Sequence, residues 1–441
     1  MDLIKGDVKL LYKQYLMASV TGALVMSIYT FVDTIAIGQS EGPIGSAAMA
    51  VINPFFGVLI FIATLVGIGG SVLMTNARGE GDKEKGDAYF TVSLLLMGVF
   101  VIAVWAVFVL FHEPIFTFFG ADSELMPKVM EYAIWIISTI PVFVTPVFIG
   151  SFIRNDGAPA LTMKAVIIGG CMNVFGDWLF VFPLGMGIAG AAAATLLGTS
   201  VQLAVMCSHF FTKRCTLRLA KLQGAIQAIW SIFSIGIGAS ILEVGTIFLS
   251  IVMNNQIMRY GDTTALAIYG VIGTICTLFQ AVFRGVGQAI QPIVSANCGA
   301  GQIERIKQTW KLSLGTVVVL GIVFTAIGEL LPVPIVRLFI DTTPEVISAA
   351  PSISRPFFLV FLFLGITVLS TYYLQSNMQG KMSMIVAILR SIVISGLLLF
   401  VLPIFMDITG VWLAMPVSEL IVATISICYI TINNQSKIKE K

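Results

Sequence analysis

Six ionisable side chains lie within long apolar stretches of this 441-residue sequence, where water would not solvate a charge. They are Asp33, Asp177, Glu243, Arg284, Arg390 and Glu419. If lipid surrounds these stretches, a charge near the centre of a spanning helix costs at least about 2.5 to 3.5 kcal/mol. Each charge therefore needs an oppositely charged partner, a water-filled cavity or a function.

The polar residues of the first half fall at similar depths in three separate apolar stretches. Asn173 precedes Asp177 by four residues, which places both on one face of a helix. At a rise of about 1.5 Å per residue, Asp33 lies roughly 8 Å, Asp177 roughly 9 Å and Thr195 roughly 12 Å below the same membrane surface. We therefore expect these four side chains to form one oxygen-lined pocket.

Such a pocket would bind a proton or a small cation. Two carboxylates repel each other where little water reaches them, so one should hold a proton unless a cation enters. Carboxylate, amide and hydroxyl oxygens also suit a hard cation such as Na⁺. The alternative is that these groups only join helices by hydrogen bonds, but Asp33 and Asp177 at matching depth favour a function.

The second half of the chain has a polar stripe instead of an acidic pocket. Gln280, Arg284, Gln288 and Gln291 recur at intervals of four, four and three residues, which marks one face of a helix. We expect this stripe to line a central cavity. Glu243 is a second candidate for cation contact or protonation, and a structural pair with Arg284 is an equally good interpretation.

Arg390 and Glu419 lie in the last two apolar stretches of the chain. We expect these two side chains to neutralise each other as a structural ion pair. They are therefore not assigned to the coupling site.

The composition excludes a soluble globular protein. Apolar residues make up 57% of the chain and charged residues only 11%, with a mean hydropathy of +0.97. Globular proteins average about 45 to 50% apolar and about 25% charged residues. The apolar blocks accommodate twelve spans of about 20 residues, which predicts an all-α polytopic membrane protein.

The basic residues and an internal repeat give the orientation and the domain organisation. Twenty of the 25 Lys and Arg residues fall on one side of the predicted spans and four on the other, which places both termini in the cytoplasm. The second half of the chain matches the first at a constant offset, as in the pairs Gly79 with Gly299 and Pro183 with Pro403. We therefore predict two parallel six-helix lobes, residues 1–211 and 228–441, joined by a cytoplasmic linker, residues 212–227.

Signatures of other functions are absent from the sequence. The six cysteines form no CxxC, so we expect neither a metal site nor a disulfide framework. GMGIAG, residues 185–190, matches the GxGxxG pattern but joins two spans, so it does not predict nucleotide binding. His112 and His209 are predicted to be isolated at span ends, and no nucleophile with a positioned base is evident. We expect no enzyme, no cofactor and no nucleic-acid partner.

Three sequence segments resemble a known family. They are FVDTIAIG at residues 31–38, FIRNDGAP at 152–159 and NVFGDWLFVFPLGMGIAGAAAAT at 173–195. Together with the two halves of six spans, they are similar to the multidrug and toxic compound extrusion (MATE) family, over nearly the whole chain. The resemblance implies a monomeric cation-coupled antiporter of the cell membrane that exports amphipathic, often cationic drugs and confers antibiotic resistance.

The resemblance also implies site residues. The cation site in the N-lobe of such proteins falls on Asp33, Asn173, Asp177 and Thr195, with Na⁺ or H⁺ as the coupling ion. Glu243 resembles the seventh-span glutamate of other branches. The sequence departs from many relatives in having no early proline in its first span and no acidic residue in its tenth. Coupling should therefore lie mainly in the N-lobe, with the polar stripe as the substrate cavity.

Two rival functions make different demands on the sequence. A flippase for lipid-linked precursors of the same superfamily would need a cationic cavity, for which Arg284 is the best support. A passive channel or scaffold needs no paired buried carboxylates. The acidic content of the first half favours the drug antiporter over both.

Overall fold

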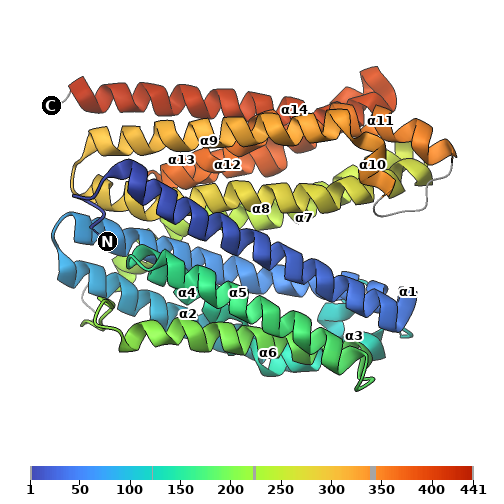
Figure 1. Ribbon diagram of the computed structural model, residues 1–441, viewed down its shortest axis with the longest axis horizontal. Helices are drawn as coiled ribbons and strands as arrows, with labels where there is room; N and C mark the ends of the chain where they lie inside the picture. The colour runs from blue at the N-terminus through green and yellow to red at the C-terminus, as the bar shows by residue number, and fades with distance from the viewer. Residues whose placement is uncertain (1, 122, 222–224, 338–343, 440–441) are drawn as a thin grey trace.

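The computed structural model describes residues 2–121, 123–221, 225–337 and 344–439, and these are nearly all helical. They form two bundles, with α1–α6 in the lower half of Figure 1 and α7–α14 in the upper half. This arrangement confirms the predicted all-α fold with two lobes.

The N-lobe contains six helices and two short helical segments. These are α1 (Val8–Gly79), α2 (Lys83–Phe118), α3 (Met126–Ser138), α4 (Ile140–Asn155), α5 (Pro159–Gly176), the π-helix η1 (Asp177–Val181), α6 (Gly187–Cys207) and the 3₁₀ helix η2 (Ser208–Phe211). The backbone of α1 breaks at Gly42, whose φ of 63° suits glycine, so α1 supplies two spans. Helices α3 and α4 bend by 58° and together supply one span.

The C-lobe follows the same plan. Its helices are α7 (Ala225–Tyr260), α8 (Thr263–Gly299), α9 (Ile303–Leu330), α10 (Pro332–Arg337), α11 (Pro344–Phe358), α12 (Phe361–Ser376), α13 (Gly380–Ile388), the π-helix η3 (Leu389–Val393) and α14 (Ile394–Lys439). The helical backbone of α14 breaks at Asp407. Ser395 and Ser418, on either side of this break, are hydrogen-bonded to each other at 2.6 Å, which shows that the chain reverses direction there. With this reversal, the described helices provide the twelve predicted spans.

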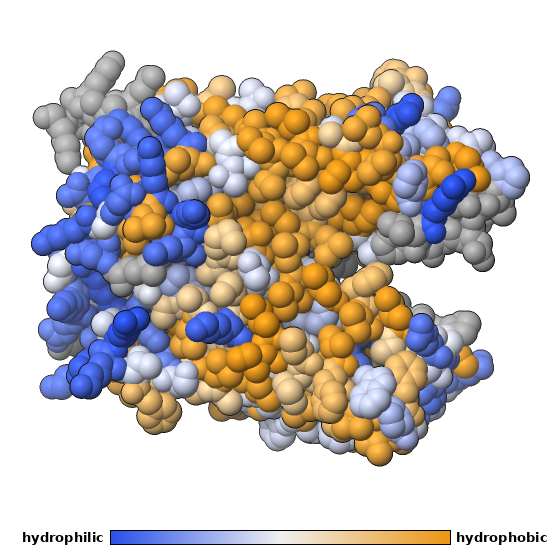
Figure 2. Space-filling view, viewed as in Figure 1, coloured by the Kyte–Doolittle hydropathy of each residue, from blue (hydrophilic) through white to orange (hydrophobic). Residues whose placement is uncertain are grey.

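The surface explains how lipid selects this fold. An apolar band crosses the middle of both lobes in Figure 2, and hydrophilic side chains gather at the end that carries both termini. Lipid offers no hydrogen-bonding partners for backbone N–H and C=O groups, and long helices pair these groups internally. The two lobes separate at the end opposite the termini, where Figure 2 shows a cleft between them.

The lobes meet along α1, α7 and α8. At the end that carries the termini, the hydroxyl of Ser295 on α8 donates to the carbonyl oxygen of Val72 on α1 at 2.6 Å. Gly79 and Gly299, the pair identified by the sequence repeat, lie against the backbone of Ala296 and Asn76 in the opposite lobe. The molecule is therefore closed at this end and open at the other.

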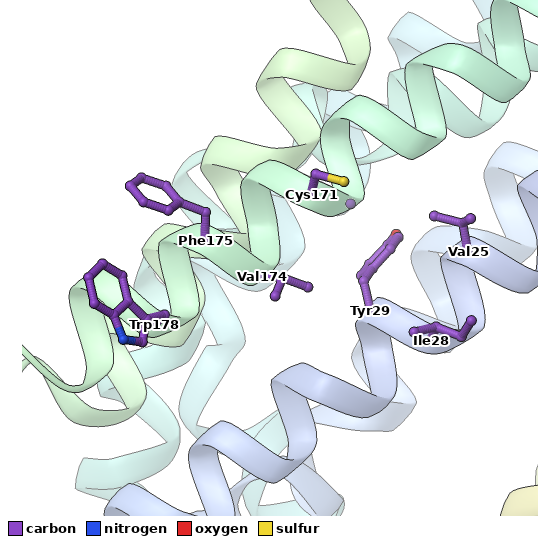
Figure 3. Close-up of a pocket in the computed structure, with 8 residues that line it drawn as sticks. Val25, Ile28, Tyr29, Cys171, Val174, Phe175 and Trp178 are labelled. Carbon is purple, nitrogen blue, oxygen red and sulfur yellow. The ribbon is translucent and has the colours of Figure 1, made fainter.

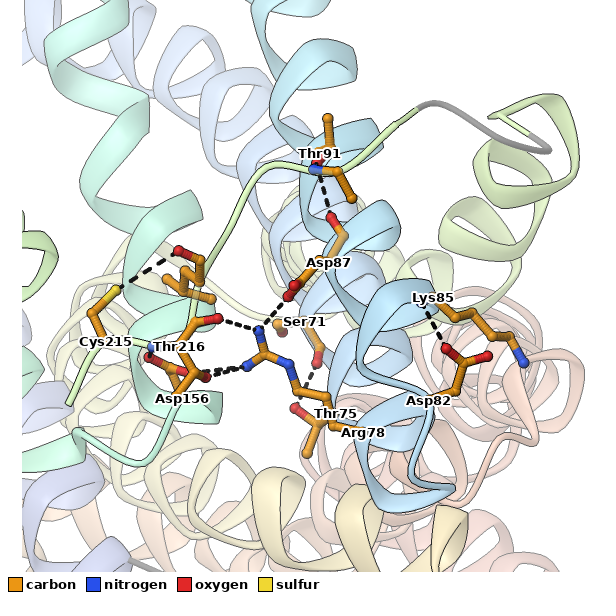
Figure 4. Close-up of polar contacts among 12 residues, drawn as sticks. Ser71, Thr75, Arg78, Asp82, Lys85, Asp87, Thr91, Asp156, Cys215 and Thr216 are labelled. Carbon is orange, nitrogen blue, oxygen red and sulfur yellow. Dashed lines mark hydrogen bonds and ion pairs between the residues drawn. The ribbon is translucent and has the colours of Figure 1, made fainter. Parts of the chain in front are cut away.

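Arg78 organises a polar cluster at the same end of the N-lobe (Figure 4). Its guanidinium contacts Asp87 at 2.8 Å and Asp156 at 2.9 Å, and it donates to the hydroxyl of Thr216 at 2.8 Å. His209 Nε2 lies 2.7 Å from the other oxygen of Asp156. The prediction that His209 is isolated was therefore wrong. We call Arg78, Asp87, Asp156, His209 and Thr216 the Arg78 cluster.

The cluster attaches the segment between the lobes to the N-lobe. Thr216, which accepts from Arg78, belongs to the predicted linker, residues 212–227. A second linker residue, Ala220, donates its backbone amide to the hydroxyl of Thr91 at 2.9 Å. Cys215 lies near Asp156 and His209, in a spacing that could hold a metal ion. Because Arg78 and Thr216 already donate to Asp156, we interpret this group as a hydrogen-bond network.

Asp156 should contribute measurably to stability. Burial opposes its ionisation, but hydrogen bonds from His209 and Thr216 and the charge of Arg78 hold the pKa of Asp156 below its ordinary value of 3.8. A carboxylate whose pKa is lowered by folding stabilises the protein above its unfolded pKa, and this stabilisation is lost as the pH falls through the folded value.

We therefore expect Asp156→Asn to lower the free energy of unfolding at neutral pH by about 1 to 3 kcal/mol. Thermal unfolding in detergent measures this difference. The matched control is Asp82→Asn, because Asp82 is an exposed N-cap and asparagine caps a helix equally well. Equal melting temperatures for the two variants would contradict the prediction.

Candidate functional site

The structure brings the four predicted oxygen-bearing residues of the N-lobe together. Asp33 on α1, Asn173 on α5 and Asp177 at the start of η1 are 6%, 3% and 1% exposed. The carboxyl groups of Asp33 and Asp177 lie within hydrogen-bonding reach of each other, and Asp33 also reaches the hydroxyl of Thr195 on α6. The amide of Asn173 donates to that hydroxyl at 3.5 Å.

Small residues allow this convergence. Gly198 on α6 lies directly against Asn173, and a Cβ at Gly198 would stand only 2.7 Å from the Cβ of Asn173. Gly176 likewise lies against Ala194. Contacts between small residues are how spanning helices approach closely in lipid. The run GAAAAT that ends at Thr195 is thus the sequence feature that seats α6 against α5.

Four buried oxygen atoms in this cluster receive no hydrogen bond from the described part of the chain. They are Oδ1 of Asp33, Oδ1 of Asn173 and both carboxylate oxygens of Asp177. An unsatisfied buried acceptor costs about 1 to 3 kcal/mol, and more when it is charged. A proton on one carboxyl would turn the contact between Asp33 and Asp177 into a hydrogen bond, and a small cation would be shared by all four atoms. The donor set fits either.

Two tyrosines that the sequence analysis did not select adjoin the cluster. Tyr132 on α3 is 1% exposed and its hydroxyl lies near Thr195, while Tyr29 lies one turn before Asp33 on α1. Tyr29 could have been found by its spacing of four residues from Asp33. Tyr132 carries no such signal, because its position depends on how α3 packs against α6.

An apolar pocket opens beside the cluster, between α1 and α5 (Figure 3). It has a volume of about 410 Å³ and is lined by Val25, Ile28, Tyr29, Gly170, Cys171, Val174, Phe175 and Trp178. Tyr29 is shared with the surroundings of Asp33, and Val174 follows Asn173 directly. Tyr29 therefore lies between the pocket and the acidic cluster.

The polar stripe of the C-lobe lies on α8 as predicted. Gln280, Arg284 and Gln288 are half-buried on one helix face, and Gln291 is fully buried. The side chain of Glu243 lies outside the described residues, so its role and its pairing with Arg284 stay predictions.

Arg390 and Glu419 form the predicted ion pair. Arg390 Nε lies 2.6 Å from Oε1 of Glu419, and the hydroxyl of Thr367 on α12 donates to Oε2. Glu419 is fully buried, so removing either partner would leave an uncompensated charge.

A family model described as MatE matches residues 18–179 and 237–401, well over half of the chain. The chain belongs to the MatE family. The starts of the two matched segments are separated by nearly the same length of chain as Gly79 and Gly299, the pair from the sequence repeat. Each segment therefore corresponds to one lobe of a MATE transporter.

Relatives and solved structures agree with this assignment. The chain is 25% identical over 406 residues to the multidrug export protein MepA of Staphylococcus haemolyticus, covering 91% of this chain and 88% of the relative. It is 25% identical over 409 residues to MepA of Staphylococcus aureus MSSA476, covering 90% and 88%.

The fold matches a multidrug resistance MATE family transporter of the MOP superfamily in an outward-facing conformation. The TM-score is 0.92 at 20% identity, covering 99% and 98% of the two chains. A MOP superfamily transporter from Pyrococcus furiosus, whose binding pocket has reverse polarity, gives 0.91 at 21% with the same coverage. The MATE family and the predicted fold are thus confirmed, and the chain is a multi-pass membrane transporter.

Proposed function

We propose that this MATE transporter is a multidrug efflux antiporter, driven by Na⁺ or H⁺, that exports amphipathic and often cationic compounds from the cytoplasm. The observation that carries the proposal is the group of four donor-free oxygens around Asp33 and Asp177 in the described part of the N-lobe. The name multidrug export protein, which the MepA relatives bear, supports the class of substrate.

Each residue of the cluster has a role in this proposal. Asp33 and Asp177 supply the charge that attracts the ion, and the neutral oxygens of Asn173 and Thr195 complete its surroundings. The ion enters from the outer side, relieves the repulsion between the carboxyl groups and shifts the N-lobe to a form that holds drug less tightly. The ion can do this only if it binds the two forms with different affinities.

The proposed orientation places the termini and the linker in the cytoplasm. It follows from the excess of Lys and Arg at that end of the spans. Since the lobes separate at the opposite end, the structure corresponds to a form open to the outside. Gln280, Arg284 and Gln288 then form part of the cavity that the substrate occupies between the lobes.

Transport in proteoliposomes tests the proposal. A fluorescent organic cation should move against its own gradient when a Na⁺ gradient or a pH gradient is imposed, and the effective gradient identifies the coupling ion. Proteoliposomes that contain the Asp177→Asn variant are the negative control. This variant is expected to fold but to lack one charge of the ion site, so it should not move the cation uphill. Absence of uphill movement under both gradients would refute the proposal, and transfer of a fluorescent lipid-linked sugar instead would favour the flippase.

A further inference from the structure

The buried ion pair of the C-lobe lies on the spans that correspond to two of the three spans contributing to the acidic cluster of the N-lobe. The third of those contributing spans is the first span, which carries Asp33. Asp177 and Thr195 belong to the fifth and sixth spans of the first lobe, and Arg390 and Glu419 belong to the fifth and sixth spans of the second. Both fifth spans also contain a π-helix, η1 starting at Asp177 and η3 including Arg390. Such segments in α-helices are frequent at functional sites.

The repeat places the ion pair of the C-lobe somewhat closer than the acidic cluster of the N-lobe to the end that carries the termini. When the two halves are aligned by this repeat, Asn173 corresponds to position 393 and Thr195 to position 415. Arg390 lies three residues before the first position and seven before position 397, which corresponds to Asp177, and Glu419 lies four residues after the second. Because these spans run in opposite directions, these shifts of roughly 5 to 10 Å all point the same way, toward the end that carries the termini.

The two sites differ in how their carboxylates are satisfied. In the N-lobe, neither oxygen of Asp177 accepts a hydrogen bond from the residues that the structure describes. In the C-lobe, Oε1 of Glu419 accepts from Arg390 and Oε2 accepts from Thr367, so both oxygens are satisfied. The guanidinium of Arg390 therefore supplies the positive charge for Glu419 that a bound ion would supply for Asp33 and Asp177.

We propose that the surroundings of Glu419 form a second monovalent-cation site, which Arg390 occupies as a permanently attached cation. The C-lobe then stays in its cation-bound arrangement throughout transport, and only the N-lobe responds to the ion. This inference rests on the proposed cation coupling for its place in the transport cycle, but its chemistry at Glu419 can be tested without transport.

Few other titratable groups adjoin the pair in the described part of the chain. The elements packed against η3 and α14 are α7, α11, α12 and α13, and α11 carries Glu345 and Arg355 at its two ends. On α12, Tyr372 lies against Gly287 and Tyr373 against Trp310. Lys381 lies nine residues before Arg390.

Glu243 requires a control of its own. It lies on α7 two residues from Gly245, which packs against Ser391, and its side chain is outside the described residues. All test variants are therefore made in a Glu243→Gln background, so that Glu243 cannot contribute to the ion response.

The experiment measures the melting temperature of the purified protein against Na⁺ concentration, with choline chloride holding the ionic strength constant, and against pH. Arg390→Met replaces the attached cation with an uncharged side chain of similar volume, so an ion from solution should bind at Glu419 and stabilise the protein. The slope of the melting temperature against the logarithm of Na⁺ or H⁺ concentration should therefore double. The double variant Arg390→Met/Glu419→Gln should return to the slope of the Glu243→Gln parent.

Each outcome decides the inference. If Arg390→Met responds to ions no differently from its parent, the proposal is overturned. If Arg390→Met is unfolded without Na⁺, the proposal requires that Na⁺ or acid restores its fold. If neither Na⁺ nor acid restores it, while Arg390→Met/Glu419→Gln folds, the proposal is also overturned. A parent with no ion response would count against cation coupling in the N-lobe, whereas a response that appears with Arg390→Met would still support the site at Glu419.

Discussion

Asp33→Asn is expected to abolish uphill drug export while the protein still inserts and folds. Asparagine keeps the shape of the side chain but removes one of the two charges that lie within hydrogen-bonding reach in the N-lobe. The remaining carboxyl of Asp177 can then hold its ion equally in both forms, so the coupling energy disappears. Couplings between sites are typically worth about 5- to 150-fold in affinity, and we expect a loss of export of at least about ten-fold.

The drug concentration ratio across cells or proteoliposomes at steady state measures this effect. Asp262→Asn is the matched control, because Asp262 is an exposed N-cap of α8 and asparagine caps a helix equally well. Export by Asp33→Asn at the rate of the control would show that the cluster is not the coupling site. A loss of folded protein would be detected by size-exclusion chromatography before transport is measured.

Most of the fold could be predicted from the sequence because lipid leaves few alternatives. A chain in lipid must satisfy its backbone internally, so apolar blocks of sufficient length become helices. The breaks inside these helices were less visible. The bend of 58° between α3 and α4 and the two π-helices depend on packing between neighbouring spans, which hydropathy does not record.

The candidate site was predictable to the extent that depth and helix face determine contact. Asp33, Asp177 and Thr195 converge because they lie at one depth, on helices that small residues bring together. Tyr132 and the pairing of His209 with Asp156 were not predicted. Both contacts depend on the rotation of one element about its own axis relative to another, and a lone tyrosine or histidine in an apolar stretch gives no periodic signal for that rotation.

The glycines between the lobes determine how tightly the molecule closes at the end of the termini. A Cβ at Gly79 would stand 2.2 Å from the carbonyl oxygen of Ala296, and a Cβ at Gly299 would stand 1.9 Å from that of Asn76. These obstacles are backbone atoms, so no side-chain rotation relieves the clash. Gly79 and Gly299 are related by the repeat, so each lobe presents a glycine to the backbone of the other near the axis that relates them.

Gly79→Ala/Gly299→Ala should therefore push the lobes apart at this end and reduce drug export about 5- to 150-fold, since overpacking costs about 1 to 3 kcal/mol. Because alanine favours a helix by about 1 kcal/mol over glycine, a loss cannot come from helix propensity. Two quantities are measured: drug export, and the rate at which a thiol reagent labels Cys298, which adjoins Gly299. The labelling uses a protein in which the other five cysteines are replaced by serine. Labelling should become faster as the lobes separate.

Gly98→Ala provides the control for this pair, because Gly98 is exposed on α2 and a Cβ there would meet no atom of the described chain within 4 Å. It should insert, fold and export drug at least as well as the parent. If the double variant exports drug like Gly98→Ala and Cys298 labels at the parental rate, the two lobes do not close on these glycines during transport. A loss of export without faster labelling would place the effect inside a lobe, since lobe separation must expose the helix end that carries Cys298.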